Sequence, residues 1–192
     1  TVLRHSLARD VAKVLREGDI TAVLVTHDRE EALDLADLVV VMDAGRIVQV
    51  GTPLEIYESP ATPWVASFVG DTVELPGVWR DDALDCQQCG AKDFCGPAEN
   101  RLGCSGHVEC ALGDVAATAR GYEPTAGETV RVVVRPEWLV PASTGIPARV
   151  RGVSYAGHDA LVEFDVEGAG ERVRARIAAP FLPTVGQDFH LA

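Results

Sequence analysis

Residues 21–37 constrain the fold more than any other segment, because they join two secondary-structure patterns through a single histidine. An apolar run rich in β-branched residues ends at Thr26, and apolar residues at helical spacing follow Asp28. Asp28 and Glu31, three residues apart, form an acidic version of the capping box that starts a helix. The pattern therefore predicts His27 at the carboxyl end of a buried strand, where open α/β sheets bind their ligands.

The flanking residues extend this pattern in both directions. Apolar positions at helical spacing predict an amphipathic helix over residues 1–15. Downstream, residues 38–42 predict a second strand, a turn follows at residues 43–45, and residues 46–51 predict a third strand. The near-continuous apolar character of the first two strands is typical of a sheet that is covered on both faces.

The order of these segments resembles the switch-histidine region of the ATP-binding subunits of ABC transporters. Residues 51–57 resemble the helix after the final strand in the importer subfamily, and residues 64–69 resemble the exit segment of iron, sulfate and polyamine importers. In that family the histidine contacts the γ-phosphate of ATP and helps to orient the attacking water when two subunits close. The resemblance implies this role for His27.

The same resemblance implies the surroundings of the full-length protein. Its cofactors would be ATP and Mg²⁺, and it would act as a homodimer bound to a membrane permease subunit. It would be cytoplasmic and peripheral to the inner face of the cell membrane. Ferric iron is the expected cargo, or else another small ion or solute, because the sequence does not identify the transported substrate.

Several motifs of an ATPase are missing from the sequence. A phosphate-binding loop needs Gly-x-x-x-x-Gly-Lys-Ser/Thr, but the chain has only two lysines, Lys13 and Lys92, and each follows an alanine. An apolar strand ending in Asp-Glu and a Ser-Gly-Gly-Gln sequence are absent too. We therefore expect the C-terminal portion of a longer ATPase, inactive by itself in ATP hydrolysis. We also expect self-association or strand exchange to cover its apolar sheet edge.

Composition excludes some classes of partner. The chain carries 29 acidic and 17 basic residues and a net charge of −12, which argues against nucleic acid. Its longest apolar runs are about five residues, far short of the ~20 that span a bilayer. From the first residues alone we expect no signal peptide, although the start of a fragment does not settle targeting.

Beyond Gly70 the hydrophobic pattern changes to short alternating strands separated by Gly-rich turns. This pattern predicts a small β-barrel. The sequences Val-Arg-Pro-Glu and Tyr-x-Gly-His-Asp resemble the TOBE accessory domain of ferric-iron importer ATPases. The predicted fold is therefore the α/β C-terminal part of an ATPase domain over residues 1–70, followed by an all-β, OB-like TOBE barrel over residues 71–192. The strands that carry the barrel prediction lie at residues 108–113, 129–138, 146–155, 160–166 and 171–177.

Five arginines of the barrel region have two interpretations. They could form a site for a small anion, since some relatives of such barrels bind oxyanions, or they could lie on a solvated outer face. They are Arg135, Arg149, Arg151, Arg174 and Arg176.

A cysteine-rich segment over about residues 80–106 departs from the family pattern. It contains Cys86, Cys89, Cys95 and Cys104 and almost no apolar residues, so burial cannot order it. Disulfides are disfavoured in a reducing cytosol, and four thiolates fit zinc or an iron–sulfur cluster. The spacing matches neither a zinc ribbon nor a common ferredoxin motif, so disulfides formed on isolation and unlinked thiols stay open.

Two further residues and two further functions belong to this region. Cys110 is left over from the cluster, and His107 is a substitute ligand. Besides the importer ATPase, the sequence allows a metal- or redox-sensing regulatory domain that uses the cysteine cluster. It also allows an oxyanion-binding domain.

Overall fold

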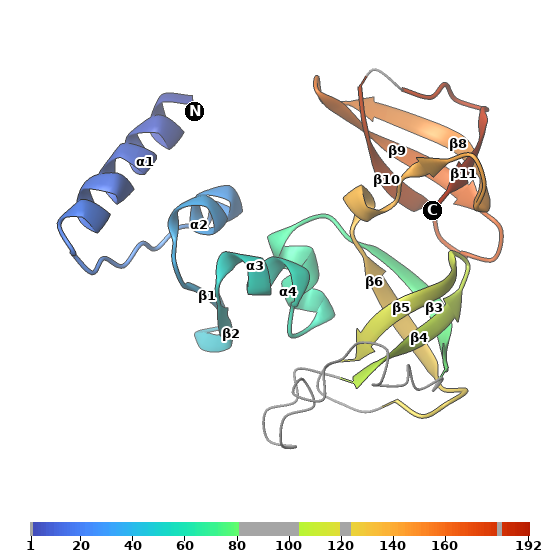
Figure 1. The fold of residues 1–192 in the computed structure, drawn as a ribbon, viewed down its shortest axis with the longest axis horizontal. Coiled ribbons are helices and arrows are strands. Elements are labelled where there is room, and N and C mark those ends of the chain that lie inside the picture. Colours follow the sequence, from blue (N-terminus) through green and yellow to red (C-terminus); the bar gives the residue numbers. More distant parts are fainter. Residues whose placement is uncertain (1, 81–103, 120–123, 180–181) are drawn as a thin grey trace. The chain divides into compact units, whose positions relative to one another are not determined.

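The computed structural model describes residues 2–80, 104–119, 124–179 and 182–192 (Figure 1). The chain divides into two compact units, Thr1–Gly70 and Asp71–Ala192. Helices and a two-stranded sheet make up the described part of unit 1, and two antiparallel sheets make up that of unit 2. The predicted fold class, an α/β segment followed by an all-β barrel domain, is confirmed.

Helix α1 (Val2–Glu17) forms where the amphipathic pattern predicts it. Polar contacts attach it to α2 (Arg29–Leu35): Arg9 Nε lies 2.7 Å from Asp34 Oδ2, and Arg16 donates to the carbonyl of the last residue of α2 at 2.8 Å. The apolar stripe of α1 is nevertheless exposed. The described residues of this stripe with the largest exposure are Leu7, Val11 and Val14.

The strand predicted over residues 21–26 does not form, and that prediction is wrong. A strand is defined by backbone hydrogen bonds to a neighbouring strand, and in the described part of the chain no strand pairs with this segment. As a result Val23 and Val25 are 89% and 91% exposed. His27 follows an exposed segment rather than a buried strand.

The next two strands form a hairpin. Strand β1 (Val39–Asp43) pairs with β2 (Arg46–Gly51) in antiparallel register, with a bulge after the third residue of β1. Ala44 and Gly45 in the turn have positive φ values of 45° and 76°. This backbone matches the twist of the two strands and favours a two-residue loop.

Helices α3 (Pro53–Glu58) and α4 (Pro63–Val69) each begin with a threonine cap and a proline. The backbone N–H and hydroxyl of Thr52 donate to the Glu55 carboxylate, and these hydrogen bonds lower the pKa of Glu55. Both helices pack their apolar faces against the hairpin. The core of unit 1 consists of Val39, Val41, Ile56, Val65 and Val69.

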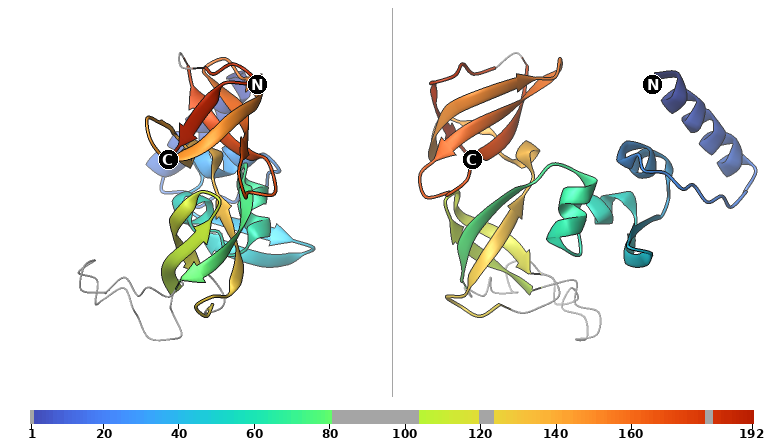
Figure 2. Two further views of the ribbon diagram at one scale, coloured as in Figure 1. Left: turned by 90° about the vertical axis from the view of Figure 1, so that its right-hand side faces the viewer. Right: turned by 180° about the vertical axis from the view of Figure 1, so that it is seen from behind.

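Unit 2 contains two curled sheets, seen from two more directions in Figure 2. Their strand orders are β5-β4-β3-β6 and β10-β9-β8-β11-β7, and all recorded pairings are antiparallel. The first sheet consists of β3 (Val73–Arg80), β4 (Cys104–Cys110), β5 (Gly113–Ala119) and β6 (Thr129–Val134). The 3₁₀ helix η2 (Pro136–Trp138) leads to β7 (Pro141–Ala142), β8 (Ile146–Tyr155), β9 (Asp159–Val166), β10 (Val173–Ala178) and β11 (Asp188–Leu191).

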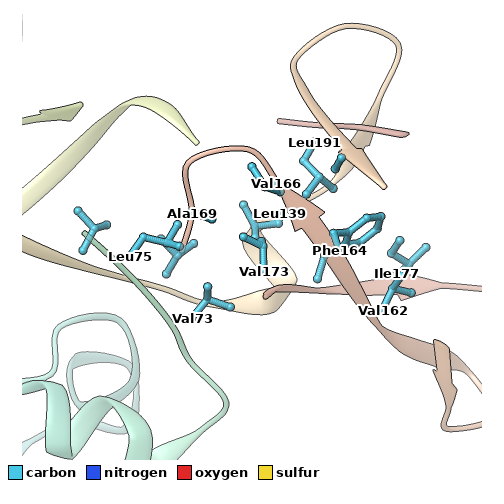
Figure 3. Close-up of a cluster of buried hydrophobic side chains, with 14 of the residues drawn as sticks. Val73, Leu75, Leu139, Val162, Phe164, Val166, Ala169, Val173, Ile177 and Leu191 are labelled. Atoms are coloured by element: carbon cyan, nitrogen blue, oxygen red, sulfur yellow. The ribbon is translucent and has the colours of Figure 1, made fainter. Parts of the chain in front are cut away.

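Side chains from both sheets share one core (Figure 3). Alternate residues of β3 and β9 are buried, as the period of two predicts. Val73 and Leu75 of β3 belong to the same buried cluster as Val162 and Phe164 of β9. This shared core makes unit 2 one packed body.

The segment predicted as an insertion at about residues 80–106 connects two neighbouring strands. Arg80 is the last residue of β3 and pairs with His107 of β4. Because Cys104 already belongs to β4, residues 81–103 join β3 to β4.

The helices that the structure describes include none with the length and apolar character needed to cross a membrane.

Candidate functional site

His27 is exposed, and the residues on both sides of it are held by hydrogen bonds. The Thr26 hydroxyl donates to the Glu31 carboxylate at 2.9 Å and accepts the backbone N–H of Asp28 at 3.0 Å. Glu31 is only 8% exposed, so this acceptor is fixed within unit 1. The hydrogen bonds of Thr26 and Asp28 therefore restrict the backbone on both sides of His27.

Asp28 is the N-cap of α2, as its position in the sequence predicts. Its Oδ1 accepts the backbone N–H groups of Glu30 at 3.1 Å and Glu31 at 3.3 Å. These bonds satisfy two donors at the start of the helix. The Glu31 side chain in turn reaches back to the Thr26 hydroxyl. The cap and the support of His27 are thus one hydrogen-bond network.

Arg29 adds a contact that the sequence analysis missed. Its Nη1 donates to the carbonyl of Phe68 at 3.1 Å, near the end of α4. The one available signal is the position of Arg29 in the first turn of α2, where the helix dipole disfavours a positive charge. The partner, 39 positions away in the chain, cannot be read from such a local pattern.

This arrangement suits contact with an anion that approaches from outside the unit. An imidazole can donate an N–H to a phosphate oxygen while its other nitrogen makes a second hydrogen bond. Support of the neighbouring backbone limits how far the ring position can vary. His27 is thus an exposed side chain on a backbone that is held on both sides.

The predicted cysteine site falls almost wholly outside the described residues. Cys86, Cys89 and Cys95 lie in the connection 81–103, and Cys104 contributes only its backbone to the description of β4. Cys110, at the other end of β4, is a free cysteine of intermediate exposure. Among the residues described, no group of three or more His, Cys, Asp or Glu side chains could hold a metal ion.

His107, the substitute ligand, lies on β4 with its Nδ1 3.3 Å from Asp114 Oδ2 on β5. It therefore faces a carboxylate across two adjacent strands. This pair is too small to be a metal centre by itself.

Four of the five barrel arginines have oxygen atoms of the protein as partners. Arg176 lies between Asp71 and Asp159, at 3.2 and 3.0 Å, and the hydrogen bond with Asp159 raises the pKa of Arg176. Arg151 pairs with Asp165. The remaining contacts are those of Arg135 with the carbonyl of Asp71 and of Arg174 with the carbonyl of Thr72. These contacts favour a structural role over a small-anion site.

Comparison with known proteins agrees with the resemblance read from the sequence. Residues 132–192 match the TOBE domain family. The Fe(3+) ions import ATP-binding protein FbpC 1 of Rhodococcus jostii is 38% identical over 182 residues, covering 91% of this chain and 43% of the relative. The sulfate/thiosulfate import ATP-binding protein CysA of Xanthomonas campestris is 34% identical over 191 residues, covering 99% of this chain and 48% of the relative.

A third relative, the sulfate/thiosulfate import ATP-binding protein CysA 2 of Chromobacterium violaceum, is 38% identical over 187 residues and covers 94% of this chain. The chain spans less than half of the length of these relatives, 43% to 48%. The similarity runs through both units, because it covers nine-tenths or more of the chain. The TOBE match and these relatives together support the identification of the chain as a portion of an ABC importer ATP-binding subunit that carries a TOBE domain.

Proposed function

We propose that this chain is part of the ATP-hydrolysing subunit of an ABC importer and that His27 contacts the γ-phosphate of ATP in the full-length dimer. The observation that supports this proposal is the hydrogen-bond network that holds Thr26 and Asp28 on either side of the exposed His27. Mg²⁺ bound with ATP would neutralise phosphate charge. The ligands for Mg²⁺ and the phosphate-binding loop would come from residues that this sequence does not contain.

In this proposal the protein positions groups and supplies little covalent chemistry, as in other phosphoryl transfers. One imidazole N–H of His27 donates to a γ-phosphate oxygen. The other ring nitrogen is available to a water molecule on the attack side. The Thr26–Glu31 hydrogen bond limits how far the backbone next to His27 can move relative to the start of α2.

The partners and location follow from the same proposal. The full-length subunit would dimerise, bind a membrane permease and work on the cytoplasmic side of the membrane. The relatives are named as importers of Fe(3+) ions and of sulfate or thiosulfate. We propose a small inorganic ion as cargo, with ferric iron first. The measurement is ATP turnover in the presence of a binding protein loaded either with ferric iron or with sulfate. Ferric iron as cargo predicts stimulation by the iron-loaded protein, whereas stimulation by the sulfate-loaded protein alone would contradict it.

The histidine is tested by His27→Ala in the full-length subunit assembled with its permease. We expect ATP turnover to fall by about 10²-fold or more, while nucleotide binding changes little. His158→Ala is the matched control, because His158 is an exposed histidine of unit 2 far from this network in sequence. Equal turnover in the two variants would show that His27 does not have the proposed role.

A second proposal concerns the cysteines. The concentration of Cys86, Cys89, Cys95 and Cys104 in and beside one connection supports a thiolate site for zinc or an iron–sulfur cluster that senses metal or redox state. Elemental analysis and an absorbance scan of anaerobically purified protein are expected to show bound zinc or iron. The double variant Cys86→Ser with Cys89→Ser should lose the bound metal, and the control variant Cys110→Ser should keep it. Metal-free protein with fully reactive thiols, or with disulfides by mass spectrometry, would contradict this proposal.

A further inference from the structure

The hydrogen bonds around His27 tie it to the start of α2. The Thr26 hydroxyl donates to Glu31 of that helix and accepts the backbone N–H of Asp28, the N-cap. The helix is short, seven residues or about 10 Å, and Glu31 is its one buried residue. Little of α2 is packed, so the position of His27 depends on polar contacts between α2 and other elements.

Arg29, the first residue of α2, makes such a contact with α4. Its Nη1 donates to the carbonyl of Phe68 at 3.1 Å. Phe68 lies in the last turn of α4, where carbonyls have no partner within the helix. The last turn of α4 contains no basic residue of its own. Arg29 therefore supplies the positive charge that the carboxyl end of a helix favours.

The same charge is unfavourable for α2 itself. The amino end of a helix favours negative side chains, and the other residues of this first turn, Glu30 and Glu31, follow that preference. Arg29 departs from it and gains a contact with another helix instead. A conflict between local preference and a tertiary contact is expected at functional sites.

Helix α4 is a firm attachment point within unit 1. Three of its seven residues are buried. The connection that precedes it is also held, because the side-chain amide of Gln49 in β2 donates to the carbonyl of Ser59 at 3.0 Å and accepts the backbone N–H of Ala61 at 2.7 Å. Arg29 thus attaches the start of α2 to the packed part of the unit.

The other end of α2 is held by an arginine as well. Arg16 of α1 donates to the carbonyl of Leu35 at 2.8 Å, and the last turn of α2 has no basic residue of its own. Of the two arginines that hold α2, Arg29 is the nearer to His27 in the chain, two positions away.

From these contacts we propose that Arg29 is a positioning residue for His27. Its hydrogen bond to α4 restrains the first turn of α2, and the hydrogen bonds of Thr26 and Asp28 pass this restraint to the backbone of His27. The inference rests on the proposed function, because the position of His27 affects turnover only if His27 contacts the γ-phosphate. All of these contacts lie within unit 1.

The contribution of Arg29 to turnover passes through His27. A hydrogen bond weakens steeply as its angle departs from linearity, so a small shift of His27 weakens its contact with a phosphate oxygen. The guanidinium of Arg29 is bonded to the Phe68 carbonyl. Its loss should therefore lower turnover only while His27 is present. A general structural role would lower turnover with or without His27.

The first measurement is the backbone order parameter of His27, obtained by NMR relaxation on the full 192-residue chain without nucleotide. We expect Arg29→Ala to lower it from about 0.85, typical of rigid backbone, towards about 0.6, typical of flexible backbone. Arg29→Lys keeps a charged donor and should stay near the value of the unaltered chain.

Arg46→Ala is the matched control, because Arg46 is an exposed arginine of the same unit at the start of β2. Circular dichroism establishes that each variant is folded. An unchanged order parameter in Arg29→Ala, or an equal fall in Arg46→Ala, would overturn the inference.

The second measurement is ATP turnover of the full-length subunit assembled with its permease. Arg29→Ala should lower kcat about fivefold and leave the KM for ATP unchanged, since only the placement of one catalytic group is affected. Added to His27→Ala, it should lower turnover no further than His27→Ala alone.

The two measurements separate this inference from the proposed function. Losses that add in the double variant would overturn the inference and leave the proposed function intact. Turnover of His27→Ala equal to that of the unaltered subunit would contradict the proposed function instead. The order parameter, measured without nucleotide, would then still decide whether Arg29 holds His27 in place.

Discussion

At the scale of single residues, the position of the Trp79 ring leaves no room for a side chain at Gly106. Trp79 of β3 is 2% exposed, and Gly106 lies on the adjacent strand β4. A Cβ atom on Gly106 would lie 2.4 Å from the indole ring, well inside contact distance. The buried ring is surrounded by core residues and cannot move aside without disturbing them.

Gly106→Ala should therefore lower the free energy of unfolding of unit 2 by about 1–3 kcal/mol, the usual cost of overpacking. Gly152→Ala is the matched control, because its Cβ would meet only side-chain atoms of Glu163, at 3.4 Å or more. Urea unfolding followed by tryptophan fluorescence measures both variants. Equal midpoints would mean that the indole can be displaced freely.

The residues around His27 show which contacts a sequence can reveal. Asp28 as a helix cap was predicted from its own position, and the structure places it there. The contact from Arg29 to Phe68 was not predicted, because it depends on how α2 and α4 pack. The role of His27 itself stays a prediction.

At the scale of elements, a strand forms where its partner is also present. The hairpin strand β2 and the barrel strand β8 have the bounds that alternation and turns predict, because each pairs with a strand nearby in the chain. Residues 21–26 have a comparable apolar pattern but no partner strand among the described residues. Local pattern thus predicts the tendency to form a strand, and the partner decides whether it forms.

The exposed segment predicts an unusual mutational contrast between two valines. Val25→Ser should change the free energy of unfolding by no more than about 0.5 kcal/mol, because the side chain already contacts water. Val65→Ala, in the core of unit 1, should cost about 2 kcal/mol. Urea unfolding followed by far-ultraviolet circular dichroism measures both changes.

Sedimentation velocity tests the related expectation that the exposed apolar residues promote self-association. Val25→Ser should shift the chain towards the monomer. A monomeric unaltered chain at micromolar concentration would contradict the expected self-association.

At the scale of the whole molecule, the two units differ in how much core they possess. Five buried apolar residues form the core cluster of unit 1, whereas the core cluster of unit 2 draws on both sheets. Because burial of apolar surface is the main favourable term in folding, unit 1 should be the less stable. Unequal cores and separate packing also weaken cooperativity between the units.

Denaturant should therefore unfold the chain in two steps, with unit 1 first. Trp64→Phe leaves Trp79 and Trp138 as the tryptophans, both in unit 2, so fluorescence then follows unit 2 alone. Circular dichroism at the helix band follows unit 1, which contains α1 to α4. We expect the helix signal to be lost at lower urea than the fluorescence signal. Coincident transitions would indicate a single cooperative body.

The pairing of β3 with β4 has an evolutionary consequence. The chain leaves β3 at Arg80 and returns on the neighbouring strand β4. The two strands pair from Gly77↔Cys110 to Arg80↔His107, so both ends of the connection are fixed by strand pairing. Closing a connection between fixed ends costs only a logarithmic increase in entropy as the connection lengthens. The barrel can therefore exchange this connection for a tight turn or for a longer module. New chemistry can be gained or lost there while the surrounding architecture is inherited intact.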